Sequence, residues 1–182
     1  MKNILFVVVL FLPIFLQAQS FRKSDKSPLD MAYFPDNFAH DRKEGEKAVI
    51  RVTYSRPMKK DRKIFGGLEK YGEVWRTGAN EATEIKLYQD IKFAGKKLKA
   101  GSYALFSIPG ETEWIIIFNS DLDYWGAYSY NEENDVLRIS AKPMESQKVI
   151  ESFTIQFEEK MDNEGVMYLA WDDIIVTIPF EY

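Results

Sequence analysis

Apolar and polar residues alternate with a period of two in several segments of this chain. In residues 152–158 every second residue is Phe or Ile, and the residues between them are polar. Successive side chains of a strand point to opposite faces, so this pattern is typical of a strand with one buried face. The same alternation in residues 47–54 and 174–180 indicates that strands, rather than helices, build the fold.

Other segments of strand length lie between turn signals such as Ala94-Gly95 and Pro109-Gly110. They are residues 84–87, 91–93, 96–98, 103–108, 114–118, 136–140 and 166–171. Eight or nine short strands, with no helical period after residue 18, predict an all-β fold: a single antiparallel β-sandwich domain of jelly-roll-like type. Asp172-Asp173 separates two of the apolar segments, and we expect it at the corner of a hairpin.

Residues 1–18 are typical of a cleaved export signal. Lys2 supplies the positive start, residues 4–16 form an apolar run, and Ala18 is a small residue before Gln19. The run is shorter than the roughly 20 apolar residues that a membrane span needs. We therefore expect a protein that begins near Gln19, is not stably inserted in a membrane, and resides in the periplasm or outside the cell.

Removing residues 1–18 from the 182 leaves 164, a length that favours one domain. We expect an N-terminal extended segment over residues 19–46 and the sandwich over residues 47–182. The chain has no Cys, and an exported domain of this size can bury a core without disulfides.

The formal net charge is −4 and the isoelectric point is about 5.2, which is the opposite of the basic footprint of a nucleic-acid binder. We therefore expect no nucleic-acid partner. One basic cluster runs against this balance, and we interpret it as a solvated loop: Lys59, Lys60, Arg62 and Lys63.

The sequence offers few residues for the common kinds of catalytic or metal site. His40 is the only histidine, and no nucleophile elbow accompanies it, so a Ser-His-Asp site is not expected. One His and no Cys cannot fill a zinc site of usual composition. The acidic residues between 121 and 135 lack the spacing of a calcium loop. We predict no catalytic residue, no metal and no cofactor.

Residues 54–83 form a long polar connection that also carries Trp75, Phe65 and Tyr71. Connections of this length are uncommon in compact domains and are usually functional or disordered. This one holds too much apolar surface for disorder. We expect an ordered loop packed on the sheet.

The run from Tyr54 to Thr83, together with residues 100–110, Trp125-Gly126 and residues 169–172, resembles the DUF2911 family. Its most specific part is the string VWRTGANEAT at residues 74–83. The resemblance extends from about Ser27 to the C-terminus. It implies an exported bacterial β-rich domain and carries over no activity. The chain departs from the family's usual pattern at Asp61, where a Gly commonly follows the Lys pair.

Two groups of side chains are candidates for binding a ligand. Arg presents a planar fork suited to carboxylate or phosphate, and Asn adds a donor and an acceptor. Exposed aromatic rings can stack on sugar rings, whereas Trp114 lies in an apolar run typical of a core. The predicted ligand-binding residues are Arg56, Arg76, Asn80, Glu81, Trp125 and Tyr128. For Arg76 and Glu81 the alternative is that each pairs within the protein and fixes the loop.

These features favour a noncatalytic ligand-binding or interaction module of the periplasm or cell surface. Its partner could be a small molecule, a glycan or a peptide, among which the sequence does not choose. One alternative is a hydrolase or lyase that uses carboxylates and Arg76 in a cleft under the loop of residues 56–81. A second alternative is a structural domain of an envelope assembly.

Overall fold

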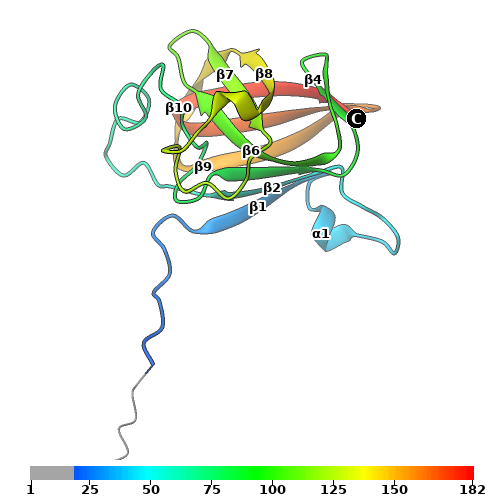
Figure 1. Ribbon diagram of the computed structural model, residues 1–182, viewed down its shortest axis with the longest axis horizontal. Helices are drawn as coiled ribbons and strands as arrows, with labels where there is room; N and C mark the ends of the chain where they lie inside the picture. The colour runs from blue at the N-terminus through cyan, green and yellow to red at the C-terminus, as the bar shows by residue number, and fades with distance from the viewer. Residues whose placement is uncertain (1–18) are drawn as a thin grey trace, which may run out of the picture.

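The computed structural model describes residues 19–182, so the signal peptide predicted for residues 1–18 lies outside the described residues. Two antiparallel sheets pack face to face (Figure 1). Helical structure among the described residues is limited to α1 (Phe38–Asp41) and the 3-10 turn η1 (Glu132–Asn134). The prediction of an all-β antiparallel sandwich is confirmed.

Six strands form the first sheet, in the order β1-β2-β3-β6-β7-β8. They are β1 (Leu29–Phe34), β2 (Ile50–Ser55), β3 (Thr83–Leu87), β6 (Gly101–Ile108), β7 (Trp114–Asn119) and β8 (Asp135–Ala141). Neighbouring strands of this sheet also follow one another along the chain, with one exception: β4 and β5, which belong to the second sheet, lie between β3 and β6 in sequence. β1 lies in the segment 19–46, where the sequence pattern predicts no strand, and it pairs along its full length with β2.

Four strands form the second sheet, in the order β5-β4-β10-β9. They are β4 (Ile91–Phe93), β5 (Lys96–Leu98), β9 (Pro143–Met161) and β10 (Glu164–Glu181). Ala94 and Gly95 join β4 to β5 with positive φ angles of 47° and 74°, the backbone of a two-residue hairpin turn. The turn predicted at this dipeptide is confirmed.

The expected hairpin corner at Asp172-Asp173 is wrong. β10 runs without interruption from Glu164 to Glu181, so the two apolar segments on either side of the acidic pair belong to one strand. Asp172 has a φ of 57° and lies where the register with β9 shifts, which marks a bulge. The bulge explains the error, because one extra residue breaks the period of two without ending the strand.

The core between the sheets is rich in aromatic rings. Trp75, Trp114 and Trp171 are each at most 2% exposed, and the stacked rings of Trp75 and Trp171 lie 5.9 Å apart. Phe65 and Phe153 pack edge-on against the same group. Burying one large apolar side chain contributes roughly 1.5–3 kcal/mol, so this cluster is a main source of stability.

The loop of residues 56–82 closes one end of the sandwich and contacts both sheets. The chain pairs with β9 at Met58 and with β6 at Trp75, and between these points Gly72 N donates to Pro109 O at 2.9 Å. Ile64 and Phe65 are at most 5% exposed. The loop is ordered and packed down, as predicted.

Candidate functional site

A hollow of about 550 Å³ opens where the first sheet, the end of the long loop and a second loop meet. We call it the Trp125 groove. Its floor is the outer face of β2, β3 and β6, and its rims are residues 80–82 and 122–125, with the N-terminal segment at its mouth. Its lining includes Arg22, Lys23, Asp25, Thr53, Ser55, Asn80, Glu81, Glu84, Ala104, Asp123 and Trp125.

The first rim is built by the turn from Trp75 to Thr83. Trp75 exchanges two main-chain hydrogen bonds with Ser107 of β6, of 2.7 and 2.9 Å, and its indole donates to Gly78 O at 3.0 Å. Thr83 then returns to the turn, donating from N to Arg76 O at 3.2 Å. A buried indole and a short set of bonds thus fix the point at which residues 80–82 emerge.

Two residues of this turn, Thr77 and Asn80, have positive φ angles. Thr77 has a φ of 52°, which a β-branched residue rarely adopts, and it is fully buried. Its hydroxyl lies 2.8 Å from that of Ser107, and its carbonyl accepts from Thr83 Oγ1. Asn80, on the rim itself, has a φ of 59°. Strained residues persist only where the surroundings hold them, and they often cluster at binding sites.

The second rim is the loop that crosses the outer face of β6 and β7. It is held by a small hydrophobic cluster in which the Phe106 and Tyr124 rings lie 5.4 Å apart. Tyr124 also donates to Asp121 at 2.8 Å. Trp125 follows directly, and its side chain remains 63% exposed at the groove.

The two rims are joined by main-chain pairing. Glu81 and Trp125 form an antiparallel bridge, with hydrogen bonds of 2.9 Å from Gly126 N to Asn80 O and from Ala82 N to Tyr124 O. These bonds flank the pair rather than joining its members, so the two residues occupy the closely spaced type of position. Side chains in such a pair lie next to each other on one face.

Carboxylates dominate the charge of the Trp125 groove. Within the described part of the chain, no side chain or main-chain N–H donates to the carboxylates of Glu81, Glu84 or Asp123. Asp25, at the mouth, accepts from Ser27 N at 2.7 Å and from the Asn80 amide at 3.0 Å. The hydrogen bond from Ser27 N, and then that from Asn80, lowers the pKa of Asp25 below its ordinary value.

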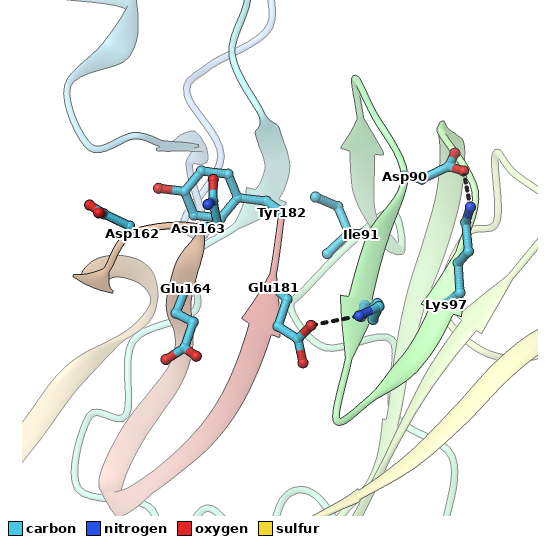
Figure 2. A pocket seen from close by; sticks show the side chains of 9 residues that line it. Asp90, Ile91, Lys97, Asp162, Asn163, Glu164, Glu181 and Tyr182 are labelled. Atoms are coloured by element: carbon cyan, nitrogen blue, oxygen red, sulfur yellow. Dashed lines mark hydrogen bonds and ion pairs between the residues drawn. The ribbon is translucent and has the colours of Figure 1, made fainter.

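A second hollow, of about 520 Å³, lies at the end of the sandwich that holds the C-terminus (Figure 2). Here the charges pair with one another: Asp90 lies 2.7 Å from Lys97, and Glu181 lies 2.8 Å from Lys92. Because both lysines of this hollow are paired with two of its four carboxylates, it is the weaker candidate for binding a ligand.

Among residues 19–182, no three His, Asp or Glu side chains are placed to hold a metal ion. In the same residues, no helix is long and apolar enough to cross a membrane.

Comparison with known families matches residues 36–180 to a protein family of unknown function, DUF2911. The chain belongs to the DUF2911 family. The match includes every residue of the Trp125 groove except the N-terminal segment of residues 22–29. Neither the curated proteins nor the solved structures contain a match to the chain.

Of the six predicted ligand-binding residues of this DUF2911 domain, three come together. Asn80, Glu81 and Trp125 line the Trp125 groove, although Trp125 is far from the other two in sequence. Tyr128 is 88% exposed and does not line the groove. Its ring packs over Gly126, where an added Cβ would lie 2.7 Å from it.

Arg56 is occupied within the protein. Its guanidinium donates to Phe153 O at 3.0 Å, to Asp30 at 2.9 Å and to Thr154 Oγ1 at 2.8 Å. The bonds to Phe153 and Thr154 reach β9 of the second sheet, and the bond to Asp30 reaches β1 of the first. The role that the structure supports for Arg56 is therefore to tie the two sheets together.

Arg76 also lies away from the groove. It is half-buried, and its Nε is buried without a hydrogen-bond partner among the described residues. Burial raises the pKa of the nearby Glu69 carboxyl, an effect that the positive charges of Arg76 and Arg62 partly offset. Among the described residues no ion pair joins Arg76 to Glu69, so the alternative in which Arg76 pairs within the protein stays a prediction.

Sequence reasoning missed Glu84, Asp123 and the hydroxyls of Thr53 and Ser55. Glu84 and Thr53 are the outward residues of two alternating strands, and they face each other across the β2–β3 pair. A polar residue on a solvent-facing strand position gives no local signal that a loop covers that face. The fold, rather than the pattern, brings them into the groove.

Proposed function

We propose that this DUF2911 domain is an exported, noncatalytic ligand-binding module and that the Trp125 groove is its binding site. The observation that carries the proposal is the 63%-exposed indole of Trp125 beside carboxylates that no described residue hydrogen-bonds. Ligand sites usually combine an apolar surface with a few convergent polar groups. The groove supplies both on a rigid support, because the sheet below it and the bridge between its rims are main-chain paired.

Export rests on the sequence of residues 1–18. The charged start, the apolar run and Ala18 support cleavage before Gln19 and release into the periplasm or the exterior. The mass of the protein recovered from the periplasm and medium tests this. A chain that retains residues 1–18 in the membrane fraction would contradict it.

The hydrolase alternative places its cleft under the loop of residues 56–81. The space beneath that loop holds Ile64, Phe65 and Trp75, each at most 5% exposed, so apolar packing fills it. Arg76, the cation of that hypothesis, does not line the groove where Glu81 lies. These placements favour binding over catalysis as the function of the domain.

A thermal-shift screen of residues 19–182 tests the proposal. The compounds should cover sugars, peptides, nucleotides, organic acids and divalent metals, because any ligand that binds only the folded state raises its melting temperature. A compound that raises the melting temperature should be recovered unchanged in mass, as expected for binding without catalysis. Conversion of that compound to a product would contradict the noncatalytic assignment.

Variants then place the compound in the groove. Trp125→Ala should abolish the shift, whereas Tyr128→Ala and Arg76→Ala should retain it, because neither of these side chains lines the groove. If Trp125→Ala and the wild type respond equally to every compound that binds, the groove is not the site.

A further inference from the structure

We propose that the Trp125 groove takes a saccharide that carries no negative charge. This inference rests on the proposed function and adds the class of ligand. Three features of the groove lead to it: the exposed indole, the free carboxylates, and a floor made from the face of a sheet rather than its edge.

The first feature is the indole itself. The other three tryptophans of the chain are at most 2% exposed and pack in the core, so Trp125 is the exception at 63%. The flat apolar face of an indole suits the C–H face of a sugar ring, and its polar edge can remain in water. The bridge to Glu81 places the Glu81 and Trp125 side chains next to each other on one face.

The second feature is the hydrogen-bonding character of the lining. Glu81, Glu84 and Asp123 carry acceptors that are not used by the described residues. Hydroxyl groups donating to carboxylates make short and strong hydrogen bonds. A saccharide is dense in such hydroxyls. The hydroxyls of Thr53 and Ser55 at the floor can both donate and accept.

The third feature is charge. The carboxylates named above and Asp25 outnumber the two cations of the lining, Arg22 and Lys23, which lie on the exposed N-terminal segment. Like charges brought together disfavour binding and slow encounter. The groove should therefore reject uronic acids, sulfated sugars and phosphates.

The floor distinguishes a saccharide from a basic peptide, which the same charge would also attract. Extended peptides usually bind by adding a strand to a sheet edge, through main-chain hydrogen bonds. At the floor, Thr53 pairs with Glu84, and Glu84 pairs with Ala104, so these strands are already flanked on both sides. The groove presents side chains and not free main-chain groups, which favours a ligand recognised through its hydroxyls.

Calorimetric titration of residues 19–182 tests the inference. The probes are neutral hexasaccharides of glucose, galactose, mannose and N-acetylglucosamine, a galacturonic acid hexamer, and a Lys/Arg hexapeptide. At least one neutral hexasaccharide should bind, and the uronic hexamer should bind weaker by about tenfold or more. Trp125→Ala should lower the affinity for the neutral sugar by about tenfold or more, and Tyr128→Ala should leave that affinity unchanged.

The Glu84→Gln variant is the sharpest test of the charge argument. Gln keeps the size and one acceptor oxygen, so the fold should be retained and discrimination against the uronic hexamer should shrink. Binding of the peptide or the uronic hexamer in preference to every neutral sugar would overturn the saccharide inference while leaving the groove as a binding site. Binding of a neutral sugar that Trp125→Ala does not weaken would overturn both proposals.

Discussion

Glu81 and Trp125 are held opposite each other by two main-chain hydrogen bonds of 2.9 Å that flank the pair. One residue ends the long loop, and the other belongs to the loop that crosses β6 and β7. Because each loop is anchored separately, by Trp75 in the core and by Tyr124 on the outer face, the pair has a fixed geometry. The proposed binding site is thus built by joining two loops rather than by one motif.

The three hydrogen bonds of Arg56 should make it a stability residue. Replacing it with Ala removes its bonds to Asp30, Thr154 and Phe153 O, and we expect a loss of roughly 1.5–3 kcal/mol in the free energy of unfolding. Arg56→Lys should recover only part of this, because an ammonium lacks the planar fork. Urea unfolding measures the loss, with the exposed Lys142→Ala as control. Equal midpoints for Arg56→Ala and the control would contradict the assignment.

Asp172 should fix the long loop to β10. Its carboxylate accepts from Ile64 N at 3.3 Å and lies 3.5 Å from Lys59 Nζ, while its own φ is 57°. Asp172→Ala leaves a buried N–H without its acceptor at a backbone angle that Ala tolerates poorly, so we expect a loss of roughly 2–4 kcal/mol. Asp172→Asn keeps an acceptor oxygen and tolerates that angle, so it should lose much less in the same urea assay. If Asp172→Asn and Asp172→Ala lower the free energy of unfolding by the same amount, the charge of Asp172 alone explains its role.

Glu69 should make stability depend on pH in the direction opposite to a salt-bridged carboxylate. Burial raises the pKa of Glu69 in the folded state above its unfolded value, so the ionised form opposes folding near neutral pH. This penalty is lost as the pH falls through the folded-state pKa, because Glu69 then takes up a proton in the folded state and its buried carboxyl becomes neutral. Glu69→Gln should therefore be more stable than the wild type at about pH 7, and the difference should vanish by about pH 4. Urea midpoints at the two pH values measure it, and a wild type more stable than Glu69→Gln at the higher pH would show the opposite sign.

Chelators should leave the melting temperature unchanged. Two carboxylates of the 121–135 segment that sequence alone offers to calcium already accept protein donors: Asp121 from Tyr124 at 2.8 Å, and Asp135 from Tyr130 at 2.6 Å and Asn119 at 2.8 Å. Melting with and without EDTA tests this. A large drop that added calcium reverses would mean that these oxygens bind an ion.

The fold follows from the sequence where burial is one-sided. A strand with one face in the core must alternate, so residues 152–158 and 174–180 reveal their conformation locally. The bulge at Asp172 makes β10 resemble two separate strands in the sequence, because the period of two is interrupted there. The sequence does not predict β1 for a different reason. This strand lies at the edge of the sheet, where the apolar Leu29 and Met31 are exposed, so its two faces differ little in polarity.

The site follows from the sequence only in part. Asn80 and Glu81 are near the strained turn, and Trp125 is an aromatic residue in a polar context, so each has a local signal. The pairing of Glu81 with Trp125 depends on how distant segments meet, which no local pattern contains. Arg56 and Arg76 are natural candidates because a guanidinium suits a ligand carboxylate, but the guanidinium of Arg56 binds internal acceptors instead.

Acrylamide quenching of tryptophan fluorescence tests the central claim most directly. Three of the four tryptophans are at most 2% exposed, so the quenchable emission of the protein should come from Trp125, and Trp125→Phe should remove it. A neutral hexasaccharide at saturating concentration should protect this emission from acrylamide, because the sugar covers the indole in the groove. Saturating binding that leaves the quenching of Trp125 unchanged would contradict the account.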